Sequence, residues 1–272
     1  MVMIEWERLR ILGEGSYSIV YLAELRIPEE GKRMVIAMKS SKPHGLHSLQ
    51  KEGGILESFS GSKEIVECMW SITNEENGCA VCHLLMELAP YGCLGDLIRR
   101  KPFSESQVIV STRMILKGLS LIHKAGVVHC DLKPDNLLLF PPLEEGVEFQ
   151  LKIADFGLAK TKEDKCDGES REMKFRGSPF YMSPESVRGE IETALDIWSL
   201  GCIIIEMMTG LPAWHHISST RHLMFILAFP KQSPPIPSWL SLCCQDFLSK
   251  CFSKDPNQRW TATMLQRHPF LL

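Results

Sequence analysis

Apolar and polar positions alternate in short runs over the first third of the chain. Five such runs lie within residues 6–15, 17–26, 34–40, 65–73 and 79–88, a pattern typical of half-buried strands. A helical segment over Leu46–Phe59 separates the third run from the fourth. We therefore expect a small domain of five strands and one helix.

The period of the apolar positions changes near residues 88–92. Ser104-Glu105-Ser106-Gln107 is a capping box, and apolar side chains then follow one helical face from Val108 to Ile122. Further helices are predicted at Leu195–Met208, Arg221–Leu227, Leu240–Cys251 and Thr261–Gln266. The pattern predicts an α+β protein, with a β-rich lobe over residues 1–88 and a helical lobe over residues 89–272.

Two stretches limit where the chain is expected to act. The apolar run Ile197–Ile205 is bracketed by Asp196 and Glu206 and is far shorter than the roughly 20 residues of a membrane-spanning helix. The N-terminal sequence MVMIEWERLR carries charges where a signal peptide has its apolar segment. We expect a protein that is not secreted and is cytoplasmic, with the nucleus as an additional location.

Composition excludes several classes of function. A net charge of -3 provides no basic surface for nucleic acid or for an anionic membrane. The ten cysteines lie mostly in apolar stretches, which favours reduced core thiols over a disulfide framework. Cys79-Ala80-Val81-Cys82-His83 matches a haem-attachment pattern, but it continues directly into a strand-like run, so we predict a strand there.

Polar and ionisable residues interrupt an apolar stretch at residues 127–139, VVHCDLKPDNLLL. A turn between a helix and a buried strand would account for Lys-Pro-Asp-Asn. A turn alone does not explain why Asp131, Lys133 and Asn136 lie together between apolar flanks, because unpaired charges are costly to bury. These three residues are therefore candidates for a site that binds charged groups.

Two further segments of the β-rich region have phosphate-binding character. Gly13 and Gly15 lie between the first two predicted strands, where they would let backbone N–H groups approach phosphate oxygens, although a simple hairpin also explains them. Lys39 ends the apolar run Ile36-Ala37-Met38, and a buried lysine needs an anionic partner. Glu52 in the following helix is the candidate partner, and it would hold the ammonium ready for a phosphate.

A metal site is predicted from the segment Lys152–Gly157. Asp155 follows a short strand and precedes Phe156 and a flexible glycine. Carboxylate and amide oxygens suit Mg²⁺, which usually binds to one or two protein ligands together with the phosphates of a substrate. Asp155 and Asn136 are the candidate metal ligands.

These segments, in this order, resemble the signature motifs of eukaryotic protein kinases over nearly all of residues 6–270. The resemblance implies a two-lobed protein kinase fold and an enzyme that uses ATP and Mg²⁺. It also implies a role for each matching residue. Gly13, Gly15 and Val20 would form the phosphate loop, Lys39 would pair with Glu52, and the adenine would be bound by Ala37, Met86, Glu87 and Ala89. Asn136 and Asp155 would bind the metals, and Asp131 and Lys133 would be catalytic.

The resemblance also predicts positions that support the site. Glu185 of Ser183-Pro184-Glu185 would pair with Arg259, and Asp196 would brace the segment around Asp131. Lys133, two residues after Asp131, is similar to the serine/threonine-specific branch, as is Ser178. Phosphoryl transfer then depends on positioning and charge stabilisation.

Within that branch the chain most resembles plant MAP kinase kinase kinases. The resemblance rests on Ser18 in place of a third glycine, on His129-Cys130-Asp131, and on the string TRMILKGL at residues 112–119. It implies a protein substrate, a downstream kinase. A nucleotide-binding pseudokinase scaffold and a small-molecule phosphotransferase are the alternatives; intact Lys39, Asp131 and Asp155 argue against the first, and the Ser-Pro-Glu segment argues against the second.

Regulation is predicted from residues 155–185 and from Cys130. Thr161 and Ser170 are the expected phosphorylation sites, whereas Ser178 is expected to be a structural contact. Most members of the resembled family have arginine before the catalytic aspartate, and that arginine binds a phosphate group on the segment that corresponds to residues 155–185. Cys130 has no charge, so we expect it to fill a small buried space and to leave activity independent of such a phosphate.

Overall fold

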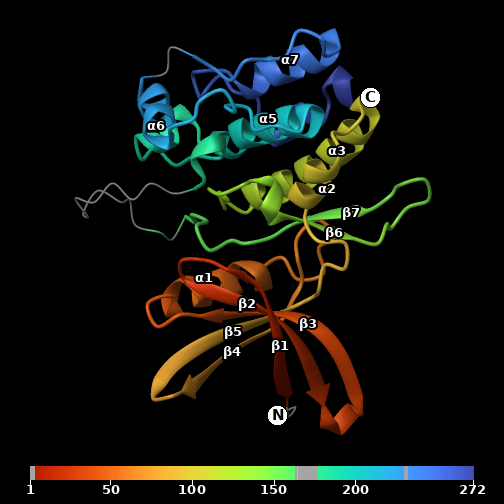
Figure 1. The fold of residues 1–272 in the computed structure, drawn as a ribbon, viewed down its shortest axis with the longest axis vertical. Helices are drawn as coiled ribbons and strands as arrows, with labels where there is room; N and C mark the ends of the chain where they lie inside the picture. Colours follow the sequence, from red (N-terminus) through yellow and green to blue (C-terminus); the bar gives the residue numbers. More distant parts are fainter. Residues whose placement is uncertain (1–3, 163, 165–176, 230–231) are drawn as a thin grey trace. The chain divides into compact units, whose positions relative to one another are not determined.

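The computed structural model describes residues 4–162, 164, 177–229 and 232–272. The chain forms two compact units, Met1–Pro90 and Tyr91–Leu272 (Figure 1). The division falls inside the segment 88–92, where the period of the apolar positions changes.

The described residues of the first unit form one antiparallel sheet and one α-helix. The strands are β1 (Glu5–Glu14), β2 (Ser18–Ile27), β3 (Lys32–Ser41), β4 (Cys68–Glu76) and β5 (Cys79–Met86), in the order β1-β2-β3-β5-β4. The helix is α1 (Leu46–Glu57), and a short 3-10 turn, η1 (Pro28–Glu30), joins β2 to β3. The five predicted strands and the helix between them are thus confirmed.

The two faces of this sheet have different roles. Ala23 lies opposite Ile36, and both belong to a fully buried apolar cluster on one face. Val20 lies opposite Lys39, and Lys39 lies opposite Leu84, on the other face. A Cβ added to Gly53 of α1 would touch the Leu84 side chain, so α1 packs on this second face. Strand alternation therefore points Lys39 toward the helix.

The apolar face is closed by contacts between distant strands. Arg8 of β1 donates to both carboxylate oxygens of Glu76 on β4, at 2.8 and 3.0 Å, although β1 and β4 are the two edges of the sheet. Fully buried His83 on β5 faces this space, with Nδ1 2.8 Å from Ser40 Oγ and Nε2 2.9 Å from Asn74 Oδ1. The Cys-x-x-Cys-His segment thus forms a strand, as predicted, and both ring nitrogens of its histidine are hydrogen-bonded within the sheet.

The second unit is mainly helical. Its helices are α2 (Leu94–Arg100), α3 (Glu105–Lys124), α4 (Pro184–Val187), α5 (Ala194–Thr209), α6 (Thr220–Ala228), α7 (Leu242–Cys251) and α8 (Ala262–Leu265). Its other described elements are a hairpin of β6 (Leu137–Phe140) and β7 (Gln150–Ile153) and the 3-10 turns η2 (Pro134–Asn136), η4 (Pro179–Tyr181) and η5 (Pro269–Leu271). The predicted helices after Ser104 are confirmed, with ends that differ by one or two residues.

Capping and burial explain the two long helices. The Ser104 side chain accepts from the Gln107 N–H while the Gln107 side chain accepts from the Ser104 N–H, which is the predicted capping box. α5 is buried along nearly its whole length and ends at Gly210, whose φ of +73° is left-handed. Trp198 on α5 is completely buried and packs edge-on against Phe252. α5 is therefore the central helix of this unit.

Helix α2 was not predicted from the sequence. This helix has only seven residues, includes Gly95, and buries only Leu94, Gly95 and Ile98, so its apolar period is too short to detect. It packs against η2 and β6, and Arg99 at its C-terminal end lies 3.4 Å from Asp135.

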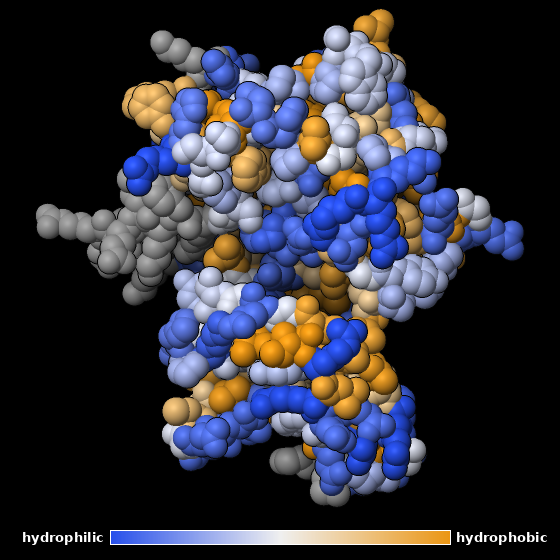
Figure 2. Space-filling model, in the orientation of Figure 1, coloured by the Kyte–Doolittle hydropathy of each residue, from blue (hydrophilic) through white to orange (hydrophobic). Residues whose placement is uncertain are grey.

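Surface and thiol properties agree with the composition. The nine described cysteines are all free thiols, and five of them are buried. No helix within the described ranges has both the length and the apolar character to cross a membrane. On the visible face in Figure 2, hydrophilic residues are interspersed with smaller hydrophobic areas.

Candidate active site

The turn between β1 and β2 carries the two candidate phosphate-binding glycines. The Gly15 N–H donates to Ser18 O at 2.9 Å, which closes the turn. A Cβ built on Gly13 would meet nothing within 4 Å, and one built on Gly15 would meet only Ser18 atoms at 3.8 Å or more. Both glycines therefore border open space, as a backbone surface for phosphate requires.

Lys39 and Glu52 form the predicted ion pair. Lys39 Nζ lies 2.8 Å from Glu52 Oε1 and 2.7 Å from Oε2, and the side chains are only 9% and 1% exposed. Removing either partner from such a pair leaves a buried charge uncompensated, at a cost of about 3–5 kcal/mol. The pair thus ties α1 to β3 and fixes the lysine ammonium.

The candidate adenine-binding residues of this unit lie near the same sheet face. Ala37 is paired with Met86 across β3 and β5, and it is two residues from Lys39, so the two side chains share a face. Glu87 and Ala89 follow β5 directly. The Glu87 N–H donates to Glu67 O at 3.1 Å, and Glu87 Oε1 accepts from the Glu67 N–H at 2.8 Å. One backbone bond and one side-chain bond to Glu67 thus hold the segment after β5.

The second unit brings the candidate catalytic residues together around one carboxylate. Asp131 Oδ2 accepts from Lys133 Nζ at 2.8 Å and from Asn136 Nδ2 at 3.2 Å. Asp131 Oδ1 accepts from the Ser178 hydroxyl at 2.8 Å, and Lys133 Nζ also donates to Ser178 Oγ at 3.1 Å. All four residues are buried or half-buried. The predicted contact of Ser178 is confirmed, and the charges between the apolar flanks are paired.

The backbone around Asp131 is held by Asp196 on α5. The Asp196 carboxylate is completely buried and accepts from the His129 N–H at 2.9 Å and the Cys130 N–H at 3.1 Å. Cys130 has a φ of +67°, a left-handed conformation that is strained for a residue with a side chain. The predicted brace is confirmed, and it supports the strained residue.

Asn136 and Asp155 lie at one end of the β6–β7 hairpin. Leu137 is paired with Ile153, and the Ala154 N–H donates to Asn136 O at 2.9 Å. Asn136 therefore lies beside Ala154, the residue that directly precedes Asp155. The Asn136 amide nitrogen donates to Asp131 O at 2.8 Å, which leaves its oxygen as the atom that suits a hard cation. Asp155 is exposed and has a φ of +63°. This donor set fits Mg²⁺ bound by few protein ligands plus phosphates.

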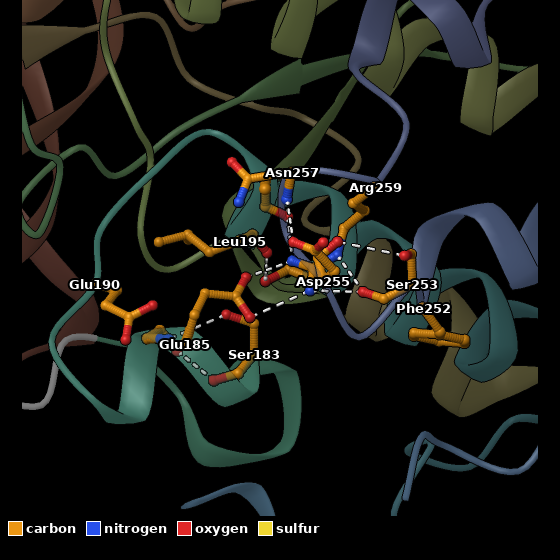
Figure 3. Close-up of polar contacts among 12 residues, drawn as sticks. Ser183, Glu185, Glu190, Leu195, Phe252, Ser253, Asp255, Asn257 and Arg259 are labelled. Atoms are coloured by element: carbon orange, nitrogen blue, oxygen red, sulfur yellow. Dashed lines mark hydrogen bonds and ion pairs between the residues drawn. The ribbon is translucent and has the colours of Figure 1, made fainter. Parts of the chain in front are cut away.

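The Ser-Pro-Glu segment is fixed by the predicted Glu185–Arg259 pair (Figure 3). Arg259 Nη1 donates to Glu185 Oε1 and, at 2.8 Å, to Ala194 O, while Nη2 lies 3.1 Å from Glu185 Oε2. The guanidinium also packs over the Trp198 ring, 5.1 Å from its centroid. Because both side chains are essentially unexposed, the pair holds α4 firmly against α5 and the segment before α8.

Cys130 packs in an apolar cluster with Val128, Ile191 and Leu195. The residue is only 6% exposed, which confirms the predicted packing role. The expected phosphorylation site Thr161 is half-buried, and its N–H donates to Asp164 at 2.8 Å. Ser170 lies outside the described residues.

One functional neighbour escaped the sequence analysis. His123, near the end of α3, places Nε2 2.8 Å from Asp196 Oδ2, so Asp196 accepts from a third donor. A lone histidine in an amphipathic helix carries no signal for this contact, because its partner is 73 residues away.

Comparison with known proteins agrees with this geometry. Residues 6–271 match the protein kinase domain. Mitogen-activated protein kinase kinase kinases 17 and 20 of Arabidopsis thaliana are 39% and 38% identical to the chain, over 98% of its length and over 70% and 78% of theirs. Mitogen-activated protein kinase kinase kinase A of Dictyostelium discoideum is 33% identical over 99% of the chain and 28% of its own length. The antiparallel sheet unit and the helical unit are the lobes of the protein kinase fold, and the chain belongs to the protein kinase family.

Proposed function

We propose that this serine/threonine kinase, which is similar to MAP kinase kinase kinases, transfers the γ-phosphate of ATP to a hydroxyl group of a downstream kinase. The observation that carries the proposal is the cluster in which Asp131 contacts Lys133, Asn136 and the Ser178 hydroxyl. The names of the relatives support the choice of protein substrate.

The first unit supplies the nucleotide contacts. The phosphate loop, residues 13–20, would approach the phosphates with its backbone N–H groups, and Lys39, fixed by Glu52, would direct its ammonium to them. Val20, Ala37 and Met86 would line the adenine, and the backbone after β5 would pair with it.

The second unit supplies the groups for transfer. Asp131 would orient the acceptor hydroxyl and take its proton, and Lys133 would offset charge on the transferring phosphoryl group. Asn136 and Asp155 would hold Mg²⁺, which neutralises charge on the phosphates. Ser178 already donates to Asp131, which shows that a hydroxyl reaches this carboxylate.

The test is transfer from labelled ATP to a panel of catalytically inactive candidate kinases. Asp131→Asn should lower kcat by about 10²–10⁴-fold, the usual contribution of a general base. Lys39→Arg is preferable to Lys39→Ala because it keeps a cation beside buried Glu52. Lys117→Ala, which changes an exposed lysine on α3, serves as control.

The expected result is loss of transfer in the Asp131 and Lys39 variants alone. Transfer at the wild-type rate by folded Asp131→Asn would overturn the assignment. A wild-type chain that binds ATP but phosphorylates none of the candidates would refute a downstream kinase from that panel as its substrate.

A further inference from the structure

The loop between β3 and α1 lies against the tip of the phosphate loop. Residues Lys42–Gly45, which we call the strap, form a turn closed by the Gly45 N–H, which donates to Lys42 O at 2.9 Å. The turn precedes α1, the helix that carries Glu52. The strap and the phosphate-loop tip Glu14–Tyr17 belong to the same unit (Figure 1).

Four contacts join the strap to the tip. The Lys42 N–H donates to Tyr17 O at 2.8 Å, and Lys42 Nζ lies 2.7 Å from Glu14 Oε1. His44 Nε2 lies 2.9 Å from Ser16 O, and because a carbonyl only accepts, this nitrogen carries the proton. The rings of Tyr17 and His44 meet edge to face with centroids 5.8 Å apart.

Gly45 makes the close approach possible. A Cβ at this position would stand 2.0 Å from Tyr17 O and 2.9 Å from Tyr17 C. The φ of Gly45 is -102°, which any residue can adopt. The contact therefore requires a glycine because it has no side chain, and not because of its backbone conformation. The strap therefore packs directly on the backbone of the phosphate loop.

The contacts differ in strength. The Lys42–Glu14 pair lies at the surface, with a half-buried lysine and an exposed glutamate whose side chains are 24% and 58% exposed, and surface pairs contribute little. The backbone bond to Tyr17 and the His44 bond to Ser16 instead fix two successive carbonyl groups of the tip. They restrict the backbone of the tip, which adjoins the open space beside Gly13 and Gly15.

We propose that the strap positions the phosphate loop for nucleotide and couples its position to α1. The inference rests on the proposed function, because it takes the open space beside the glycines as the site of the ATP phosphates. His44 and Gly45 are positioning residues, which act through Ser16 and Tyr17 and do not touch the nucleotide. A loop that the strap already orders loses less conformational freedom when ATP binds.

The experiment measures binding of ATP with Mg²⁺ by calorimetry, and KM for ATP and kcat by initial rates. His44→Ala should weaken ATP binding about two- to fivefold, in the lower range for one hydrogen bond, and should raise KM for ATP while kcat at saturating ATP stays within about twofold. His44→Gln keeps an N–H donor and should restore most of the affinity. His47→Ala, an exposed histidine on α1, is the matched control and should bind as wild type does.

Gly45→Ala should weaken ATP binding more than His44→Ala, because it forces the strap away from Tyr17. If this variant does not fold, the three histidine variants still decide the matter. Equal affinity of His44→Ala and wild type, equal loss in His44→Ala and His47→Ala, or no recovery in His44→Gln would each overturn the proposal. A wild-type chain that binds no ATP would instead overturn the proposed function itself.

Discussion

Asp196→Asn tests how the catalytic segment is held. The Asp196 carboxylate accepts three bonds: His123 Nε2 and the His129 N–H donate to Oδ2, and the Cys130 N–H donates to Oδ1. An asparagine side chain has one oxygen and one NH₂ group. If the oxygen keeps the two bonds at the Oδ2 position, the NH₂ group faces the Cys130 N–H, so two donors meet.

The magnitude follows from these contacts. Loss of one hydrogen bond to a charged acceptor costs about 1.5–3 kcal/mol. The left-handed conformation of Cys130, which that bond supports, stores about 1–2 kcal/mol that the loop can then release by moving. We expect the free energy of unfolding to fall by about 2 kcal/mol and kcat to fall at least tenfold, because Asp131 follows Cys130 directly. KM for ATP should change little, because none of these residues belongs to the nucleotide contacts.

The assay combines urea unfolding with initial rates at saturating ATP. A second variant, Cys130→Gly in the Asp196→Asn background, separates strain from charge. Glycine adopts positive φ freely, so the double variant should regain part of the lost activity if strain at Cys130 is the cause. A change below about 0.5 kcal/mol in stability together with a kcat within twofold of wild type would refute the reasoning.

Three further predictions concern other parts of the chain. Phosphatase treatment should leave most of the initial rate, because uncharged Cys130 cannot bind a phosphate as an arginine would. Loss of nearly all activity would show that a basic residue elsewhere binds the phosphate. Gly54→Ala should stabilise α1 by about 0.5–1 kcal/mol and raise ATP affinity or basal activity, since the added Cβ meets open space. Gly53→Ala should instead destabilise the protein, because its Cβ would lie 2.9 Å from Leu84 Cδ2. Similar melting temperatures for the two variants would contradict this. Burial lowers the pKa of His83 from its usual 6.5, so the unfolded chain binds a proton more readily, and the free energy of unfolding should fall as the pH drops below that value. His83→Gln should flatten this dependence in urea titrations between about pH 7.5 and 5.5, and an unchanged slope would exclude His83 as its cause.

Local patterns in the sequence were sufficient for most of the elements and for most of the candidate residues. The apolar period distinguishes the strands of the first unit from the long helices of the second, because a strand repeats every two residues and a helix every 3.6. Ser104 and Gln107 predicted where α3 begins, since a capping box needs only residues three apart. Residue type was likewise enough to predict the Lys39–Glu52 pair, because a buried lysine needs an anionic partner. The role of Asp196 follows from the resemblance to the kinase motifs.

Other features depend on contacts between residues that are distant in the sequence, which no local pattern records. The Arg8–Glu76 bond follows from the way the sheet brings its two edge strands together, and the His123–Asp196 bond from the packing of α3 on α5. The left-handed backbone of Cys130 is supported by Asp196, which accepts its N–H. The strap of Lys42–Gly45 reaches the phosphate loop only after β2 and β3 have paired and set their register. Tertiary packing therefore decided which backbone groups are held in place, because hydrogen bonds and close contacts depend on distances in space and not along the chain.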